Sequence, residues 1–114
     1  MPFSIRTVKL ATGAVRVEIS GELDIATSPR LNASLLRELV AGRDVELDLS
    51  RVTFMDACAL GTIMGARKRF ELRQQSFAVS LRRASQPHRL LRLTGILPVL
   101  TLTDGAGPSP TSRV

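Results

Sequence analysis

The alternation of apolar and polar residues predicts four strands in this chain. It is most regular over residues 15–20, where every second residue is a branched aliphatic, the pattern of a half-buried strand. Similar alternation predicts strands over residues 3–10, 44–49 and 77–81. The first of these changes phase midway, which predicts a β-bulge.

Leucines at helical spacing predict a helix that follows the second strand. Ser28 is expected to be its N-cap, because serine accepts from a free N–H and Pro29 suits the first helical position. Gly42 is placed to end the helix in a left-handed conformation. The buried face is expected to consist of Leu31, Leu35, Leu36, Leu39 and Val40.

Two more helices are expected further along the chain. One begins after Asp56, whose carboxylate can cap it, and runs to about Arg73. A shorter helix is expected to start at Ser85 with Pro87 in its first turn, and to end at Gly95.

Strands and helices alternate after an initial antiparallel hairpin, which indicates an α/β fold. We expect a mixed sheet of four to five strands with the helices packed mainly on one face. Residues 21–24 are expected to break the second strand, and the apolar segment 96–103 to supply a short edge strand near residues 99–101. The domain is expected to span residues 1–103, followed by a disordered tail over 104–114 that lacks an apolar face.

Composition narrows the function classes. The chain has 114 residues, 44% of them hydrophobic, with four Phe and no Tyr or Trp, so the core must be aliphatic. One Cys and one His are too few for a disulfide or a zinc cluster, and we expect no metal and no cofactor. No apolar run is long enough to span a bilayer, and the first residues lack the apolar region of a signal peptide, so we expect a cytoplasmic protein.

The net charge of +6 comes largely from arginine clusters. A solvated surface is the simplest interpretation, and nucleic acid or an acidic partner are the alternatives. No helix-turn-helix pattern or stacking aromatic supports nucleic acid, and no nucleophile–base pair or phosphate loop supports an enzyme. The clustered cations are Arg67, Lys68, Arg69, Arg73, Arg82, Arg83, Arg89 and Arg92.

The stretch from residue 52 to 61 combines a strand end, a loop and a helix start. Asp56 lies where the N-cap is expected, and Cys58 lies in the first turn. A small side chain at this position is expected to be exposed and open to contact by a partner.

Four short motifs resemble those of the STAS domain of bacterial anti-sigma factor antagonists. They are Gly-Glu-Leu-Asp at 21–24, Leu-Asp-Leu-Ser at 47–50, Phe-Met-Asp at 54–56 and Leu-Thr-Gly-Ile at 93–96. The resemblance covers about residues 3–102 with matching spacing.

The resemblance implies a regulator of transcription that binds an anti-sigma factor of the serine-kinase type and so releases a sigma factor. In that family the kinase phosphorylates a serine on the docking face, and the added negative charge ends binding. By resemblance, the partner-binding residues are Asp24, Thr27, Met55, Asp56, Ala57, Cys58, Ala59 and Leu60. Homodimerisation is left open.

The chain departs from the family at the position that is phosphorylated in the family. The family has Asp-Ser-Ser-Gly-Leu, whereas this sequence has Asp-Ala-Cys-Ala-Leu over 56–60, with Cys58 at the phosphorylated position. Three interpretations stay open: a silent thiol, a constitutive antagonist without its off-switch, and a redox-sensing thiol. Thr53 and Thr62 flank the loop as other hydroxyls, and a small-ligand sensor on the same fold is a further alternative.

Overall fold

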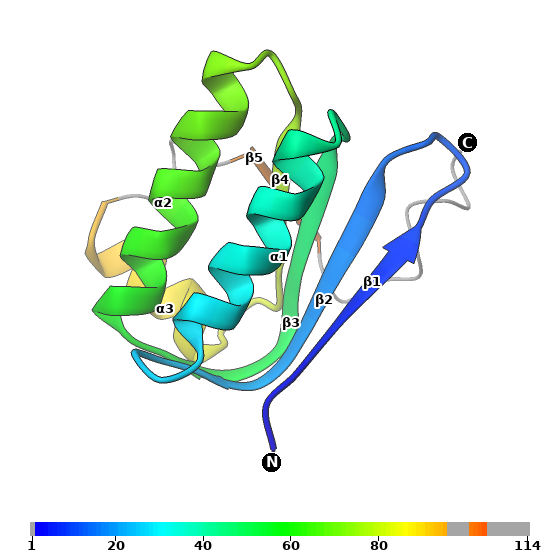
Figure 1. Cartoon of the computed structure of the whole chain (residues 1–114). Helices are drawn as coiled ribbons and strands as arrows, with labels where there is room; N and C mark the ends of the chain where they lie inside the picture. The colour runs from blue at the N-terminus through cyan, green and yellow to red at the C-terminus, as the bar shows by residue number, and fades with distance from the viewer. Residues whose placement is uncertain (1, 96–100, 105–114) are drawn as a thin grey trace.

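Five strands form one mixed sheet in the order β1-β2-β3-β4-β5, in which β1 is antiparallel to β2 and the others are parallel. The computed structural model describes residues 2–95 and 101–104. Figure 1 shows α1 and α2 side by side across one face of the sheet. The elements are β1 (Ser4–Lys9), β2 (Val15–Leu23), α1 (Ser28–Val40), β3 (Val45–Met55), α2 (Ala57–Leu72), β4 (Phe77–Leu81), α3 (Gln86–Leu93) and β5 (Thr101–Asp104).

The core lies between the sheet and the helices and is almost wholly aliphatic. The alternate residues of β2 and β3 that face α1 and α2 are buried, as their sequence pattern predicts. Phe70 of α2 and Phe77 of β4 pack with ring centroids 5.2 Å apart and fill the end of this layer. The expected α/β class, mixed sheet and placement of the helices are therefore confirmed.

The central strands are longer than expected. Residues 21–23 continue β2 instead of breaking it, and β3 continues to Met55, so the expected loop before Asp56 is strand. Gly21 permits this course because its φ is +91° and a Cβ there would lie 2.7 Å from the Pro2 carbonyl oxygen. Both strands thereby reach the same edge of the sheet.

The expected bulge in the first strand is wrong, because β1 pairs with β2 in unbroken register from Ser4↔Ser20 to Lys9↔Val15. The irregularities lie instead between β2 and β3, near Glu18 and near Gly21. The pairing of the two strands continues on both sides of each irregularity, as it does at a β-bulge.

Two details of α1 correct the sequence prediction. Its N-cap is Thr27, and Ser28 is a buried residue of the first turn. Leu36 and Val40 are exposed, so the buried face is narrower than the leucine pattern suggested. Gly42 follows the helix with φ +76°, which confirms the expected left-handed end.

The other helices start as expected, because Asp56 caps α2 and the Ser85 hydroxyl accepts from the backbone N–H of His88. β5 includes Asp104, the residue at which we expected the tail to begin. The remaining tail, residues 105–114, and the expected strand start near residue 99 lie outside the described residues.

Candidate functional site

The candidate site lies at the edge of the sheet where β2 and β3 end together. Leu23 and Met55 are paired as the last residues of these parallel strands, and the backbone N–H of Asp56 donates to the Leu23 carbonyl oxygen at 3.3 Å. The turn that follows β2 and the start of α2 are therefore neighbours, although the sequence separates them by about thirty residues. The carboxyl edge of a parallel sheet is a common place for binding sites.

The carboxylate of Asp56 joins the two segments. Its Oδ1 accepts from the backbone N–H of Ala59 at 2.9 Å and caps α2, and its Oδ2 accepts from the backbone N–H of Ile25 at 3.1 Å. The expected capping role is confirmed. The second oxygen binds the neighbouring turn.

The turn after β2 is held by its own hydrogen bonds. Asp24 Oδ1 accepts from the backbone N–H groups of Ala26 at 3.0 Å and Thr27 at 3.1 Å. Thr27 Oγ1 accepts from the backbone N–H of Asp24 at 2.9 Å and donates to the Glu22 carbonyl oxygen at 3.1 Å. Asp24 and Thr27 therefore fix the shape of the turn, and their polar side-chain atoms form hydrogen bonds mainly with backbone groups.

Gln86 is a site residue that the sequence analysis missed. Its side-chain Oε1 accepts from the backbone N–H of Met55 at 2.7 Å, and its Nε2 donates to the Met55 carbonyl oxygen at 2.9 Å. The amide thus pairs with the end of β3 as a neighbouring strand would, and it fixes the backbone immediately before Asp56. A glutamine at a helix start gives no sequence signal for this role.

The side chains of the expected partner-binding set divide into a buried group and an exposed group. Met55 and Ala59 are fully buried and Leu60 nearly so, and they anchor the loop in the core instead of lying on the exposed surface. Ala57 and Cys58 are exposed at the first turn of α2, as expected.

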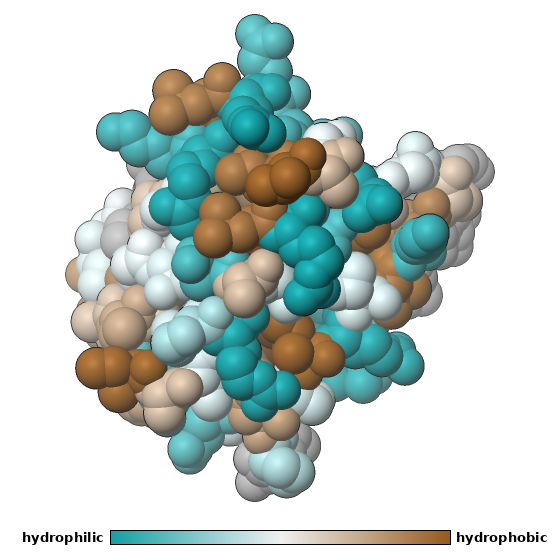
Figure 2. All heavy atoms as spheres, in the orientation of Figure 1, coloured by the Kyte–Doolittle hydropathy of each residue, from teal (hydrophilic) through white to brown (hydrophobic). Residues whose placement is uncertain are grey.

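Apolar side chains that the prediction omitted enlarge this exposed surface. Ile25 is 72% exposed and Phe54 43% exposed, and Ala26 is also exposed. Figure 2 shows hydrophobic and weakly hydrophobic spheres gathered at its lower left, around the N-terminal end of α2. The signal in the sequence was the apolar pair Ile25 and Ala26 between the polar residues Asp24 and Thr27.

This arrangement is suited to binding. Within residues 2–95 and 101–104, no three His, Cys, Asp or Glu side chains are grouped so that they could hold a metal ion. The Cys58 carbonyl oxygen accepts from Thr62 Oγ1 at 3.2 Å, which adds to the order of the first turn. The result is a rigid, small and mainly apolar surface with a single thiol, defined here as the docking surface: Ile25, Ala26, Ala57 and Cys58, bordered by Phe54.

Comparison with known proteins identifies the family. The STAS domain matches residues 6–106, so the chain belongs to the STAS family. The anti-sigma-B factor antagonist of Bacillus subtilis is 30% identical over 97 residues, which are 85% of each chain. The anti-sigma-B factor antagonist of Listeria monocytogenes is 27% identical over 108 residues, which are 94% of each chain.

Solved structures share the fold. An anti-sigma factor antagonist from Mycobacterium paratuberculosis superposes with a TM-score of 0.81 at 22% identity, covering 90% of this chain and 86% of the other. The antagonist SpoIIAA in its unphosphorylated form gives a TM-score of 0.66 at 18% identity, covering 89% and 88%. No helix among the described residues is both long and apolar enough to cross a membrane.

Proposed function

We propose that this protein is an anti-sigma factor antagonist, which binds an anti-sigma factor through the docking surface and so frees a sigma factor. The observation that carries the proposal is the exposed, apolar start of α2, held rigid by Asp56 and Gln86. The names of its relatives support the same function and favour it over nucleic-acid binding or small-ligand sensing. The protein acts by binding and carries out no reaction of its own.

The partner is an anti-sigma factor of the serine-kinase type. This part of the proposal rests on the position of residue 58, in the first turn of α2, where the family has a phosphorylated serine. SpoIIAA is known in both an unphosphorylated and a phosphorylated form. In this chain the exposed Cys58 has no hydroxyl, so the kinase cannot attach a phosphate to an oxygen there and the antagonist stays competent to bind.

The experiment is titration calorimetry of the purified protein with kinase-type anti-sigma factors from the same genome. We expect one of them to bind, and we expect Cys58→Glu to weaken binding at least 100-fold, because it places a charge on a desolvated apolar contact. Ala33→Glu adds the same charge at an exposed position of α1 and should change affinity less than threefold. If no such anti-sigma factor binds the unmodified protein, the proposed function is wrong.

A further inference from the structure

A group of arginines beside the docking surface has no role in the function proposed so far. Arg82 and Arg83 follow β4, Arg89 and Arg92 lie on α3, and all four are exposed. Arg89 Nη1 donates to the Ala84 carbonyl oxygen at 2.8 Å, which holds Arg89 against the loop that carries Arg82 and Arg83. We call these four residues the arginine face.

Acidic residues are scarce around this face, although Asp104 lies beside it, because its backbone pairs with Leu81, the residue before Arg82. The chain contains no aspartate or glutamate between Glu71 and Asp104. Within residues 2–95, none of the ion pairs involves an arginine of this face, whereas Arg6, Arg16, Arg43 and Arg67 each pair with a glutamate. Several positive charges therefore reinforce one another in a single region of the surface.

The arginine face lies close to the docking surface. The first residue of α3, Gln86, binds both backbone groups of Met55, and Met55 directly precedes the capping Asp56. α3 also packs along β3, the strand that leads to the site. A protein seated on the start of α2 therefore has the arginine face within the reach of a normal interface.

The face also carries an apolar residue. Leu93 is 80% exposed and lies one helical turn after Arg89, beside Arg92 on the same side of α3. Guanidinium groups form paired hydrogen bonds with carboxylates and with phosphates alike, so it is the exposed leucine among them that favours a protein surface over a phosphate backbone. The described part of this face has no aromatic side chain on which a base could stack.

We propose that the arginine face extends the docking surface and binds an acidic segment of the same protein partner. This inference rests on the proposed function for the identity of the partner. The arginines would attract the partner's carboxylates during approach and pair with them at the rim of the complex, so they act mainly on the association rate.

The test measures association rates with the anti-sigma factor that binds in calorimetry. Arg82→Glu/Arg83→Glu should slow association at least tenfold at low salt, and about 0.5 M salt should remove most of the difference. The matched control, Arg37→Glu/Lys68→Glu, makes the same change in net charge at exposed positions of α1 and α2 and should slow association less than threefold. Equal effects of the two double variants would overturn the inference and leave the proposed function intact.

A second measurement does not need the anti-sigma factor. A decaglutamate peptide, followed by amide chemical shifts, should perturb residues 82–93 more than residues around Arg37 and Lys68, and Arg92→Gln should reduce the shifts. No preference for residues 82–93 would contradict the inference even if no anti-sigma factor binds. Tighter binding of a DNA or RNA oligonucleotide of equal charge to the same residues would overturn it in favour of a nucleic-acid surface.

Discussion

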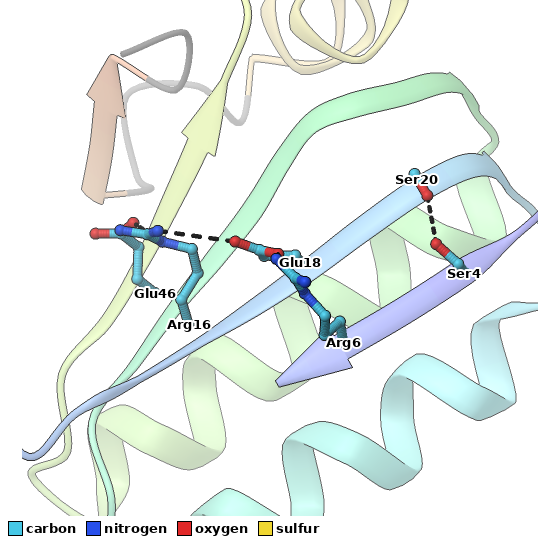
Figure 3. Close-up of polar contacts among 6 residues, drawn as sticks. All are labelled: Ser4, Arg6, Arg16, Glu18, Ser20 and Glu46. Atoms are coloured by element: carbon cyan, nitrogen blue, oxygen red, sulfur yellow. Dashed lines mark hydrogen bonds and ion pairs between the residues drawn. The ribbon is translucent and has the colours of Figure 1, made fainter. Parts of the chain in front are cut away.

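The sheet surface opposite the helices and the arginine face both carry arginines, but they differ in what surrounds the charge. On the sheet, the guanidinium of Arg16 lies 3.0 Å from Glu46 and 3.8 Å from Glu18, and Arg6 lies 2.8 Å from Glu18 (Figure 3). These residues alternate in sign across three adjacent strands, so each cation faces a carboxylate of its own chain. Within residues 2–95, no arginine of the arginine face is paired with a carboxylate in this way.

The difference shows that a charged cluster in a sequence does not by itself indicate a binding surface. Arg16 is only 7% exposed and its guanidinium pairs with Glu46 of the same chain. Breaking this pair would leave the Glu46 carboxylate poorly solvated. Arg82 and Arg83 are exposed and contribute a field that extends into solvent. Substitutions should therefore affect stability on the sheet and association on the arginine face.

The largest expected effect comes from Arg16→Met. Removing the cation leaves Glu46, a mostly buried carboxylate, without this partner, and the free energy of unfolding should fall by about 3 kcal/mol. Urea unfolding followed by circular dichroism measures the change. Arg6→Met, at a side chain 72% exposed, and Arg82→Met should each cost less than about 1 kcal/mol. A similar loss in all three variants would show that the two surfaces do not differ as described.

Substitutions of Asp56 test whether the polar groups beside the docking surface, like those of the sheet, bind other groups of the same chain. Asp56→Ala removes the cap of α2 and the bond to Ile25, and it should lower stability by about 2 kcal/mol and affinity for the partner as well. Asp56→Asn can keep an oxygen toward Ala59, but it turns an NH₂ group toward the Ile25 N–H. The asparagine variant should therefore recover most of the stability and little of the affinity; full recovery of both would show that the bond to Ile25 is dispensable.

Gln86→Ala should have a smaller effect, about 1 kcal/mol, because it removes two hydrogen bonds to the backbone of the buried Met55. Hydrogen exchange of the Met55 amide should accelerate more than that of Val79, a core residue of β4. Gln86→Glu retains an acceptor for the Met55 N–H and loses the donor to its carbonyl oxygen. Because a negative carboxylate oxygen then faces that carbonyl oxygen, the glutamate variant should cost at least as much stability as the alanine variant, and a cost smaller than that of alanine would contradict the assigned geometry.

The sequence predicted the fold well where one local signal was enough. The alternation of Val15, Val17 and Ile19 located β2, and aspartate at position 56 located the start of α2. It failed where the outcome depends on contacts between distant segments. The lengths of β2 and β3 depend on their pairing at Leu23 and Met55, which no single window reveals.

The candidate site, like the fold, was predicted where a local signal was enough and was missed where distant segments meet. The exposure of Ala57 and Cys58 follows from the first turn of a helix, and it was predicted. The bonds from Asp56 to Ile25 and from Gln86 to Met55 join residues thirty-one positions apart, so they required the folded chain. Met55 lies in the core, so its place in the motif is explained by anchoring the loop from inside.

Cys58→Ser should have the smallest effect on stability, and it should make binding of the partner depend on phosphorylation. Serine and cysteine differ little in size, and the position is exposed, so stability should change by less than about 0.5 kcal/mol. With the kinase-type partner and ATP, we expect the serine variant to gain one phosphate and to lose binding as the charge enters the apolar docking surface. Ala57→Ser, one residue earlier, serves as the matched control and should stay unmodified. Phosphate on Thr53 or Thr62 of the unmodified protein, with loss of binding, would show that the switch has moved to another hydroxyl.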